Sequence, residues 1–234
     1  ITDLSDVDIS YSTISDGQAL VWNDASGVWQ PGNVAAGGGG GSTTTVTKQG
    51  QVLETLTGIA DGRTVVVESG SYTLTNVTDT QISTTSYTDI TGTSIDYTPP
   101  TGTKQVIFTY HINMSMEQGT QPASDGNNKR GLINIQMMID GTAVESQIQA
   151  WGDDSNTYGE SFKYKGIIDI NGTNEISNGS LASWSTSKTV KLRIISYAAG
   201  YNVRLHANQY GDIGTNNTVT NTLVKPRIEI NSIG

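Results

Sequence analysis

The sequence predicts an all-β protein, in which a C-terminal antiparallel jelly roll or β-sandwich follows a small N-terminal β-hairpin unit and an extended connector. Three observations predict this fold class. Gly occurs 27 times and charged residues make up only 15% of the chain, a composition that suits short strands joined by turns. Apolar and polar residues alternate over long stretches, and turn signals separate those stretches. No stretch has the apolar spacing of an amphipathic helix.

The first expected unit covers residues 1–36 and contains one β-hairpin. Residues 19–22 (ALVW) favour a strand, residues 23–27 (NDASG) a turn, and residues 28–30 (VWQ) the return strand. A hairpin of this size is not stable alone in water, so it needs further contacts.

Two tryptophans, Trp22 and Trp29, would be left half exposed in such a hairpin. They could pack on each other or on neighbouring loops. Alternatively, three copies of the chain bury them around a shared axis, or they dock on another protein. A strand-rich unit too small for its own core favours burial between chains. Trp22 and Trp29 are therefore candidate anchor or trimer-contact residues.

Two segments connect this unit to the rest of the chain. Residues 37–42 (GGGGGS) are typical of a flexible linker. Residues 43–83 carry few large apolar side chains, so we expect an extended connector or a wrapped arm. Within it, a Ser-Gly-Ser turn at 69–71 lies between two apolar runs and predicts a tight hairpin.

Residues 84–234 are predicted to form the jelly roll. In residues 106–116 every second side chain is apolar, which predicts one buried and one mainly polar face. Similar alternation recurs later in the chain, over residues 133–139, 162–170, 190–194, 203–207 and 228–230. Seven or eight strands without helices between them indicate an antiparallel sandwich or jelly roll.

Charge and cysteine content exclude several classes of function. The net charge of −9 argues against non-specific binding to nucleic acid or to anionic membranes. No apolar run approaches the roughly 20 residues of a membrane-spanning helix. The chain has no Cys, which removes disulfides, thiol catalysis and thiolate metal sites. Its first residue is Ile1, which leaves open a removed Met, a processed chain or a fragment.

Two sets of short motifs resemble modules of viral structural proteins. Residues 50–56 (GQVLETL) and 61–65 (DGRTV), followed by residues 86–100 (SYTDITGTSIDYTPP), resemble a module of structural proteins from marine phages, notably cyanophages, and from algal viruses. Near the N-terminus, the motifs LSDVD, DGQAL and WQPG are similar to a short module common in phage tail-fibre and virion proteins.

This resemblance covers nearly the whole chain and implies a homotrimer that ends in a jelly-roll tip. By analogy of architecture alone, the tip would be similar to complement C1q or tumour-necrosis-factor domains. The implied location is the virion surface, and the implied partners are copies of the chain and other virion proteins.

Residues able to support catalysis are sparse. The only two histidines, His111 and His206, are conceivable metal ligands if their strands are neighbours, but surface or subunit-interface positions are expected for both. No HExxH, GxSxG or phosphate-binding glycine motif is present. The adjacent Asp153 and Asp154 would point to opposite faces of a strand, so they are poorly placed as paired acids. We expect no enzyme activity, no cofactor and no metal.

Loops at one end of a sandwich are the expected contact surface, because the sheets hold them still. Candidate receptor- or loop-contact residues lie in or near polar segments: Trp151, Asp153, Asp154, Tyr158, Trp184, Tyr201 and Tyr210. Aromatic rings stack on sugar rings, and Asp side chains bond to hydroxyls, which would suit a host-surface polysaccharide. The alternative is that these aromatic side chains fill a trimer interface or close the ends of the sandwich.

The order of the segments predicts a virion structural protein, either a trimeric phage fibre or a capsid decoration protein. The N-terminal unit would bind a capsid, collar or tail protein, and the jelly roll would project outward and contribute to host attachment. One alternative is a dedicated lectin-like, receptor-binding tip. A remote alternative is a glycan depolymerase.

Overall fold

A computed structural model describes residues 18–33, 49–116, 129–153, 160–199, 201–210 and 220–234. The chain separates into two compact units, Ile1–Val46 and Thr47–Gly234. Each unit is described by itself. Within the described parts of the chain, no helix has the length and apolar character that crossing a membrane requires.

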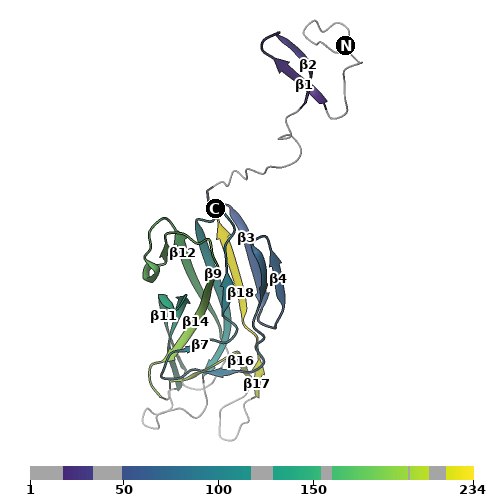
Figure 1. Cartoon of the computed structure of the whole chain (residues 1–234). Helices are drawn as coiled ribbons and strands as arrows, with labels where there is room; N and C mark the ends of the chain where they lie inside the picture. The colour runs from purple at the N-terminus through teal and green to yellow at the C-terminus, as the bar shows by residue number, and fades with distance from the viewer. Residues whose placement is uncertain (1–17, 34–48, 117–128, 154–159, 200, 211–219) are drawn as a thin grey trace. The chain divides into compact units, whose positions relative to one another are not determined.

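The first unit contains the expected hairpin (Figure 1). Strand β1 (Gln18–Asn23) pairs antiparallel with β2 (Val28–Asn33). The turn between them is closed by Gly27, whose N–H donates to the Asn23 carbonyl at 2.8 Å. Gly27 adopts a positive φ of 66°, which glycine reaches without a Cβ clash. The Gly-rich linker expected at 37–42 lies outside the described residues.

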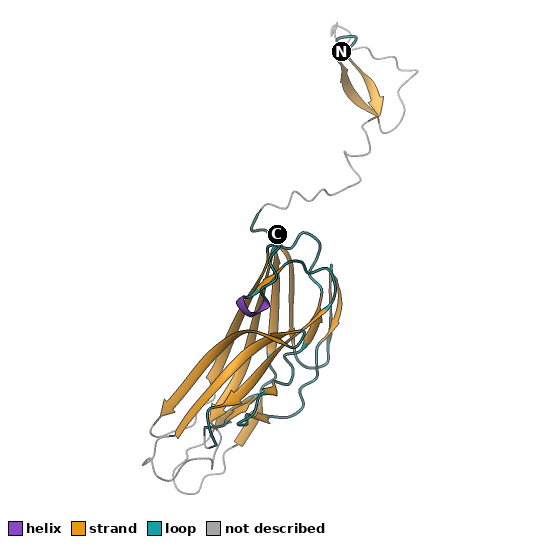
Figure 2. Ribbon diagram, turned by 60° about the vertical axis from the view of Figure 1, so that its left-hand side comes forward, coloured by secondary structure: helices purple, strands orange, loops and turns teal. Residues whose placement is uncertain are grey.

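The second unit is built from two β-sheets that pack face to face (Figures 1 and 2). The main strands of the first sheet lie in the order β3-β18-β9-β12, and those of the second in the order β8-β14-β10-β11. Their bounds are β3 Val52–Ile59, β8 Ile95–Tyr97, β9 Gln105–Met116, β10 Lys129–Ile139, β11 Thr142–Asp153, β12 Glu160–Ile170, β14 Lys188–Ser196 and β18 Arg227–Ile233.

This strand order is that of a jelly roll, because the chain crosses repeatedly between the sheets while all main pairings are antiparallel. The predicted fold class is therefore confirmed. Short elements complete the unit: β4 Thr64–Val67, β5 Gly70–Thr73, β6 Gln81–Ile82, β7 Thr88–Asp89, β13 Ser180–Leu181, β15 Val203–Leu205, β16 Ala207–Tyr210, β17 Thr220–Leu223 and the 3₁₀ turn η1 Ile176–Asn178. Of these, β13 pairs parallel with β12.

The core lies between the two sheets and follows the predicted period of two. In β9 every even-numbered residue from Val106 to Met114 is buried. In β10 the inward positions are Ile133, Ile135, Met137 and Ile139, and in β14 they include Leu192 and Ile194. Burial of these apolar side chains is the main favourable contribution to the fold.

The predicted extended connector differs most from the structure. Its described part belongs to the jelly roll, since β3 pairs with β18 along its length and β6 pairs with β15. The hairpin predicted around residues 69–71 is confirmed as β4 and β5. The jelly-roll unit therefore begins well before residue 84, because β3 completes the first sheet as an edge strand. Leu56 is the only fully buried residue of β3.

The jelly roll has two distinct ends. The chain enters it at Gln49, and Gly50 donates its N–H to the Gly234 carbonyl at 2.7 Å. We call this the proximal end; Figure 1 marks the C-terminus there. At the opposite end, which we call the distal end, β9 finishes at Met116 and pairs with Val203 of β15. Strands β16 and β17 also lie at the distal end (Figure 1).

Candidate functional site

The hairpin unit presents a pair of tryptophans on its surface. Trp22 and Trp29 are directly cross-strand, with ring centroids 5.6 Å apart in an edge-to-face arrangement. Trp22 donates its indole N–H to the Asp24 carboxylate at 2.6 Å. The two rings do pack on each other, yet they stay 44% and 41% exposed, and neighbouring Val21 is 40% exposed. This exposed apolar surface on a two-stranded hairpin fits a contact with another protein surface.

The distal end carries most of the predicted contact residues. Trp151 pairs with Gly131 and Asp153 with Lys129, so both lie where β11 ends beside the start of β10. Tyr210, the last residue of β16, pairs with Thr220. The structure gives the backbone position of these three predicted residues but does not describe their side chains. Asp154 and Tyr158 lie outside the described residues.

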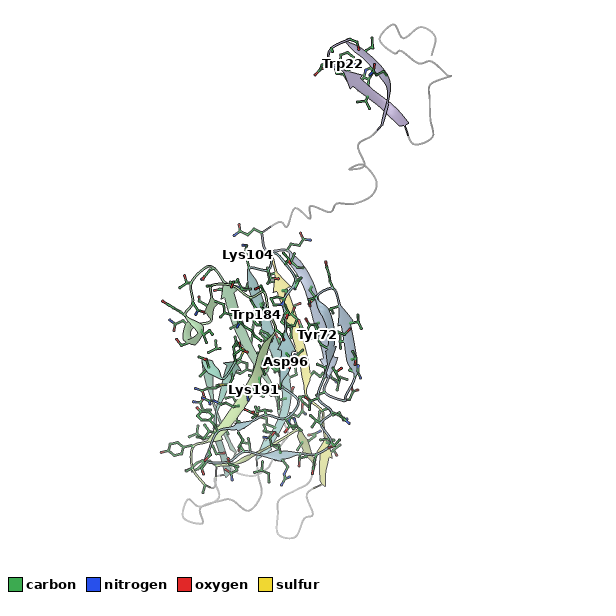
Figure 3. The ribbon with its side chains drawn as sticks, in the orientation of Figure 1. Trp22, Tyr72, Asp96, Lys104, Trp184 and Lys191 are labelled. Atoms are coloured by element: carbon green, nitrogen blue, oxygen red, sulfur yellow. The ribbon has the colours of Figure 1, made fainter. Side chains whose placement is uncertain are left out.

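Trp184 is the exception, and its predicted role in receptor contact is wrong. It lies at the proximal end, on the same side of the jelly roll as Lys104 (Figure 3). Its side chain is only 6% exposed. Its ring stacks on Phe108 with centroids 6.2 Å apart, and its indole N–H donates to the Tyr97 carbonyl at 3.1 Å. Trp184 therefore closes the core, which is the alternative that the sequence left open.

Tyr201 lies at the distal end and has an unexpected partner, Tyr197. Their ring centroids are 5.7 Å apart and the rings are nearly perpendicular, at 88°. Tyr197 is 74% exposed and Tyr201 is half buried. Tyr197 was not predicted from the sequence, although it continues the outward positions 189, 191, 193 and 195 of β14 by one further step.

The outer face of β14 also carries a charged network. Lys191 binds Asp89 of β7 at 2.6 Å. Arg193 donates its Nε–H to the Gln136 side chain at 2.9 Å, and its guanidinium lies 4.3 Å from the centre of the Tyr87 ring. Lys191 is therefore held by an ion pair, and Arg193 by a hydrogen bond and a cation–π contact.

A cavity of about 1060 Å³ opens at the proximal end, between the loop 98–104 and the loop 182–185. Several polar groups in its wall already have protein partners. Thr103 donates its hydroxyl to the Pro100 carbonyl at 2.7 Å, and Asp169 accepts from Gln105 at 2.8 Å. The cavity lies at the end where the chain enters the jelly roll.

A buried polar network near the proximal end was not predicted. Glu54 is only 6% exposed and accepts hydrogen bonds from the hydroxyls of Tyr97 at 2.8 Å and Ser69 at 2.7 Å. It also accepts from the Ser69 backbone N–H at 2.7 Å. The Tyr97 oxygen in turn accepts from the Ser232 hydroxyl at 2.8 Å. The network links β3, the β4–β5 turn, β8 and β18, and its bonded carboxylate fits a structural role.

The two histidines occupy different environments. His111 lies half buried on the outer face of β9, between Lys163 of β12 and Arg227 of β18. His206 is fully buried, which contradicts the predicted surface or interface position. In the described part of the chain, no cluster of three or more His, Asp or Glu side chains is arranged to hold a metal ion.

No protein-family model matches this chain, and a comparison with curated proteins finds no match.

Proposed function

We propose that this protein is a structural component of a virus particle, a trimeric phage fibre or capsid decoration protein that contributes to host attachment. The observation that carries the proposal is the division of the jelly roll into two ends. The chain enters and finishes at the proximal end, whereas Trp151, Asp153, Tyr201 and Tyr210 lie at the distal end. A head joined to a particle through its N-terminal unit would present this distal end outward.

The motifs that resemble phage and algal-virus structural proteins support the same proposal. The exposed Trp22–Trp29 pair supplies a surface for another virion protein or for copies of the chain. Cryo-electron microscopy of purified particles, with the protein labelled by antibody, tests the location. Particles that lack the protein would exclude a virion role.

Trimerisation gives a direct prediction. Light scattering of the full chain should yield about three times 24.8 kDa, because the undersized hairpin unit needs contacts between copies. A single-chain mass over a wide range of protein concentration would contradict the trimer. Particle location would still be tested separately.

The tryptophan pair gives a second prediction. Changing Trp22 and Trp29 together to Ser should weaken docking of the N-terminal unit by about 2 kcal/mol or more, since buried aromatic anchors dominate protein interfaces. The measurement is incorporation of the variant into particles, together with its oligomeric mass.

The matched control is Val66→Ser, which removes a 75% exposed apolar side chain from β4. This variant should be incorporated and should assemble like the parent. Melting of the jelly roll should stay unchanged in the double variant, because neither tryptophan belongs to the core. Normal incorporation and normal mass of the double variant would exclude the tryptophans as anchor residues.

A further inference from the structure

The outer face of the second sheet carries an aromatic surface that leads to the distal end. Outward positions on β14 hold Arg193 and Ile195, and Tyr197 follows directly after the strand. Ile195 pairs with Asn134 of β10, and the next outward residue of β10 is Leu132. We call the set formed by Tyr87, Leu132, Arg193, Ile195, Tyr197 and Tyr201 the tyrosine patch.

The tip of this patch is held in place by backbone hydrogen bonds. Tyr197 donates its N–H to the Leu132 carbonyl at 2.9 Å, and Leu132 donates to the Tyr201 carbonyl at 3.4 Å. Tyr201 also donates to the Ala198 carbonyl at 3.1 Å. The edge of one tyrosine ring meets the face of the other, while Tyr197 remains 74% exposed. A fixed and open ring loses little conformational entropy when a ligand binds to it.

Arg193 supplies a positive charge to the same face. Its cross-strand neighbour on β7 is Asp89, but the Asp89 carboxylate is bound by Lys191 at 2.6 Å. Within the described residues Arg193 has no ion-pair partner, and its guanidinium is fixed between the Tyr87 ring and Gln136. Only its Nε–H is used by Gln136, and a guanidinium carries five N–H donors that match a carboxylate or sulfate.

We infer that the tyrosine patch binds an acidic polysaccharide, with a sugar ring stacked on Tyr197 and a carboxylate or sulfate group bound by Arg193. Arg193 and Tyr197 are four residues apart along an extended chain, which corresponds to about 13 Å. A short oligosaccharide is long enough to contact both side chains. A surface glycan of this kind would be a host-attachment ligand, and in that respect the inference rests on the proposed function.

The net charge of the whole protein makes Arg193 the critical residue for an anionic ligand. A net charge of −9 repels an anionic polymer in general, so affinity for one must come from a local cation. The bound pair of Lys191 and Asp89 is neutral, which leaves Arg193 as that cation. Binding should therefore weaken as salt is added, because Arg193 is only partly buried and dissolved ions screen its charge.

Calorimetric titration of the purified full chain tests the inference with three probes: oligogalacturonate, dextran sulfate and neutral dextran. We expect binding to an acidic probe that exceeds binding to dextran. Tyr197→Ala should weaken it by about tenfold or more, the loss of one stacking contact. Arg193→Gln should lower affinity for the acidic probe to that for dextran. Preference for oligogalacturonate assigns a carboxylate, and preference for dextran sulfate assigns a sulfate.

A matched control is Ile167→Thr, which changes a 40% exposed side chain on the outer face of the other sheet and should leave binding unchanged. Circular dichroism checks that each variant is folded, and Tyr197→Ala is the safer variant because its ring is largely exposed. Failure of both acidic probes to bind, or undiminished binding by folded Tyr197→Ala, would overturn the inference. Because particle location is measured separately, that result would leave the proposed virion role standing.

Discussion

Replacement of Glu54 by Ala is expected to lower the free energy of unfolding of the jelly roll by about 2–4 kcal/mol, because it leaves buried hydrogen-bond donors without an acceptor. The Glu54 carboxylate is the common acceptor for the Tyr97 hydroxyl and for two donors of Ser69. Its removal leaves these donors without their partner, and the Tyr97 hydroxyl lies in a buried side chain while Ser69 is half buried. Chemical denaturation of the variant and the parent, followed by circular dichroism, measures the loss.

The Glu54 carboxylate stabilises the fold because the Tyr97 hydroxyl stays protonated and donates to it. Burial raises the pKa of Tyr97, and the neighbouring Glu54 carboxylate raises it further, against the lowering effect of the Ser232 hydrogen bond. The hydroxyl therefore stays protonated and donates to the carboxylate throughout the physiological range. Tyr72 extends the network, because its hydroxyl donates to the Thr98 carbonyl at 3.0 Å and its oxygen lies 2.9 Å from that of Ser69.

Two variants control this measurement. Glu68→Ala removes an exposed carboxylate that follows β4 and should change stability by no more than about 0.5 kcal/mol. Glu54→Gln keeps the shape and one acceptor but brings an NH₂ group toward donors, so its loss should be intermediate. If Glu54→Ala cost no more than Glu68→Ala, the network would not stabilise the fold.

Glu54 also explains why the sequence predicts a connector where the structure has β3. An edge strand with inward apolar residues at every second position is recognised by its alternation. In β3 the inward positions include both Glu54 and Leu56, so a charged residue interrupts the pattern. The burial of Glu54 depends on hydroxyls from segments far away in the chain, and a local pattern cannot show them.

Long strands with uninterrupted alternation were predicted closely. The apolar positions of residues 106–116 correspond to β9, and residues 190–194 lie within β14. Their order within the sheets was not predicted, because pairing between distant strands depends on the whole fold rather than on local periodicity. The two strands of the N-terminal hairpin were also predicted, but their register was not: the structure adds Asn23 to the first strand and pairs Trp22 with Trp29.

The candidate contact residues were predicted less evenly. Aromatic residues in polar segments were treated alike, yet Trp184 closes the proximal end of the core while Tyr201 lies at the distal end. Sequence composition does not distinguish the two ends of a sandwich, since both are made of similar turns. Tyr197 was missed because it follows β14 and lies outside the run of alternating apolar residues.

Acidification should destabilise the jelly roll through His206. Burial lowers the pKa of His206 from 6.5 to about 4; a contact with the Thr91 backbone, which does not reach hydrogen-bond geometry, opposes this in part. Between pH 6.5 and pH 4 the unfolded chain therefore binds a proton that the folded chain does not. Stability from this group is complete above pH 6.5 and falls by about 3 kcal/mol in total by pH 4.

The geometry at His206 indicates which variant should remove this pH dependence. Its φ of 60° lies in the left-handed region, where Asn is the best tolerated residue after Gly, and its backbone N–H donates to the Asn113 carbonyl at 2.7 Å. His206→Asn should be less stable than the parent at pH 7 but should lose most of the stability change between pH 7 and pH 5. His111→Asn, on the outer face of β9, should keep that change. Unfolding free energies measured by urea titration at a series of pH values decide the matter, and an unaltered slope in His206→Asn would assign the acid sensitivity to other groups.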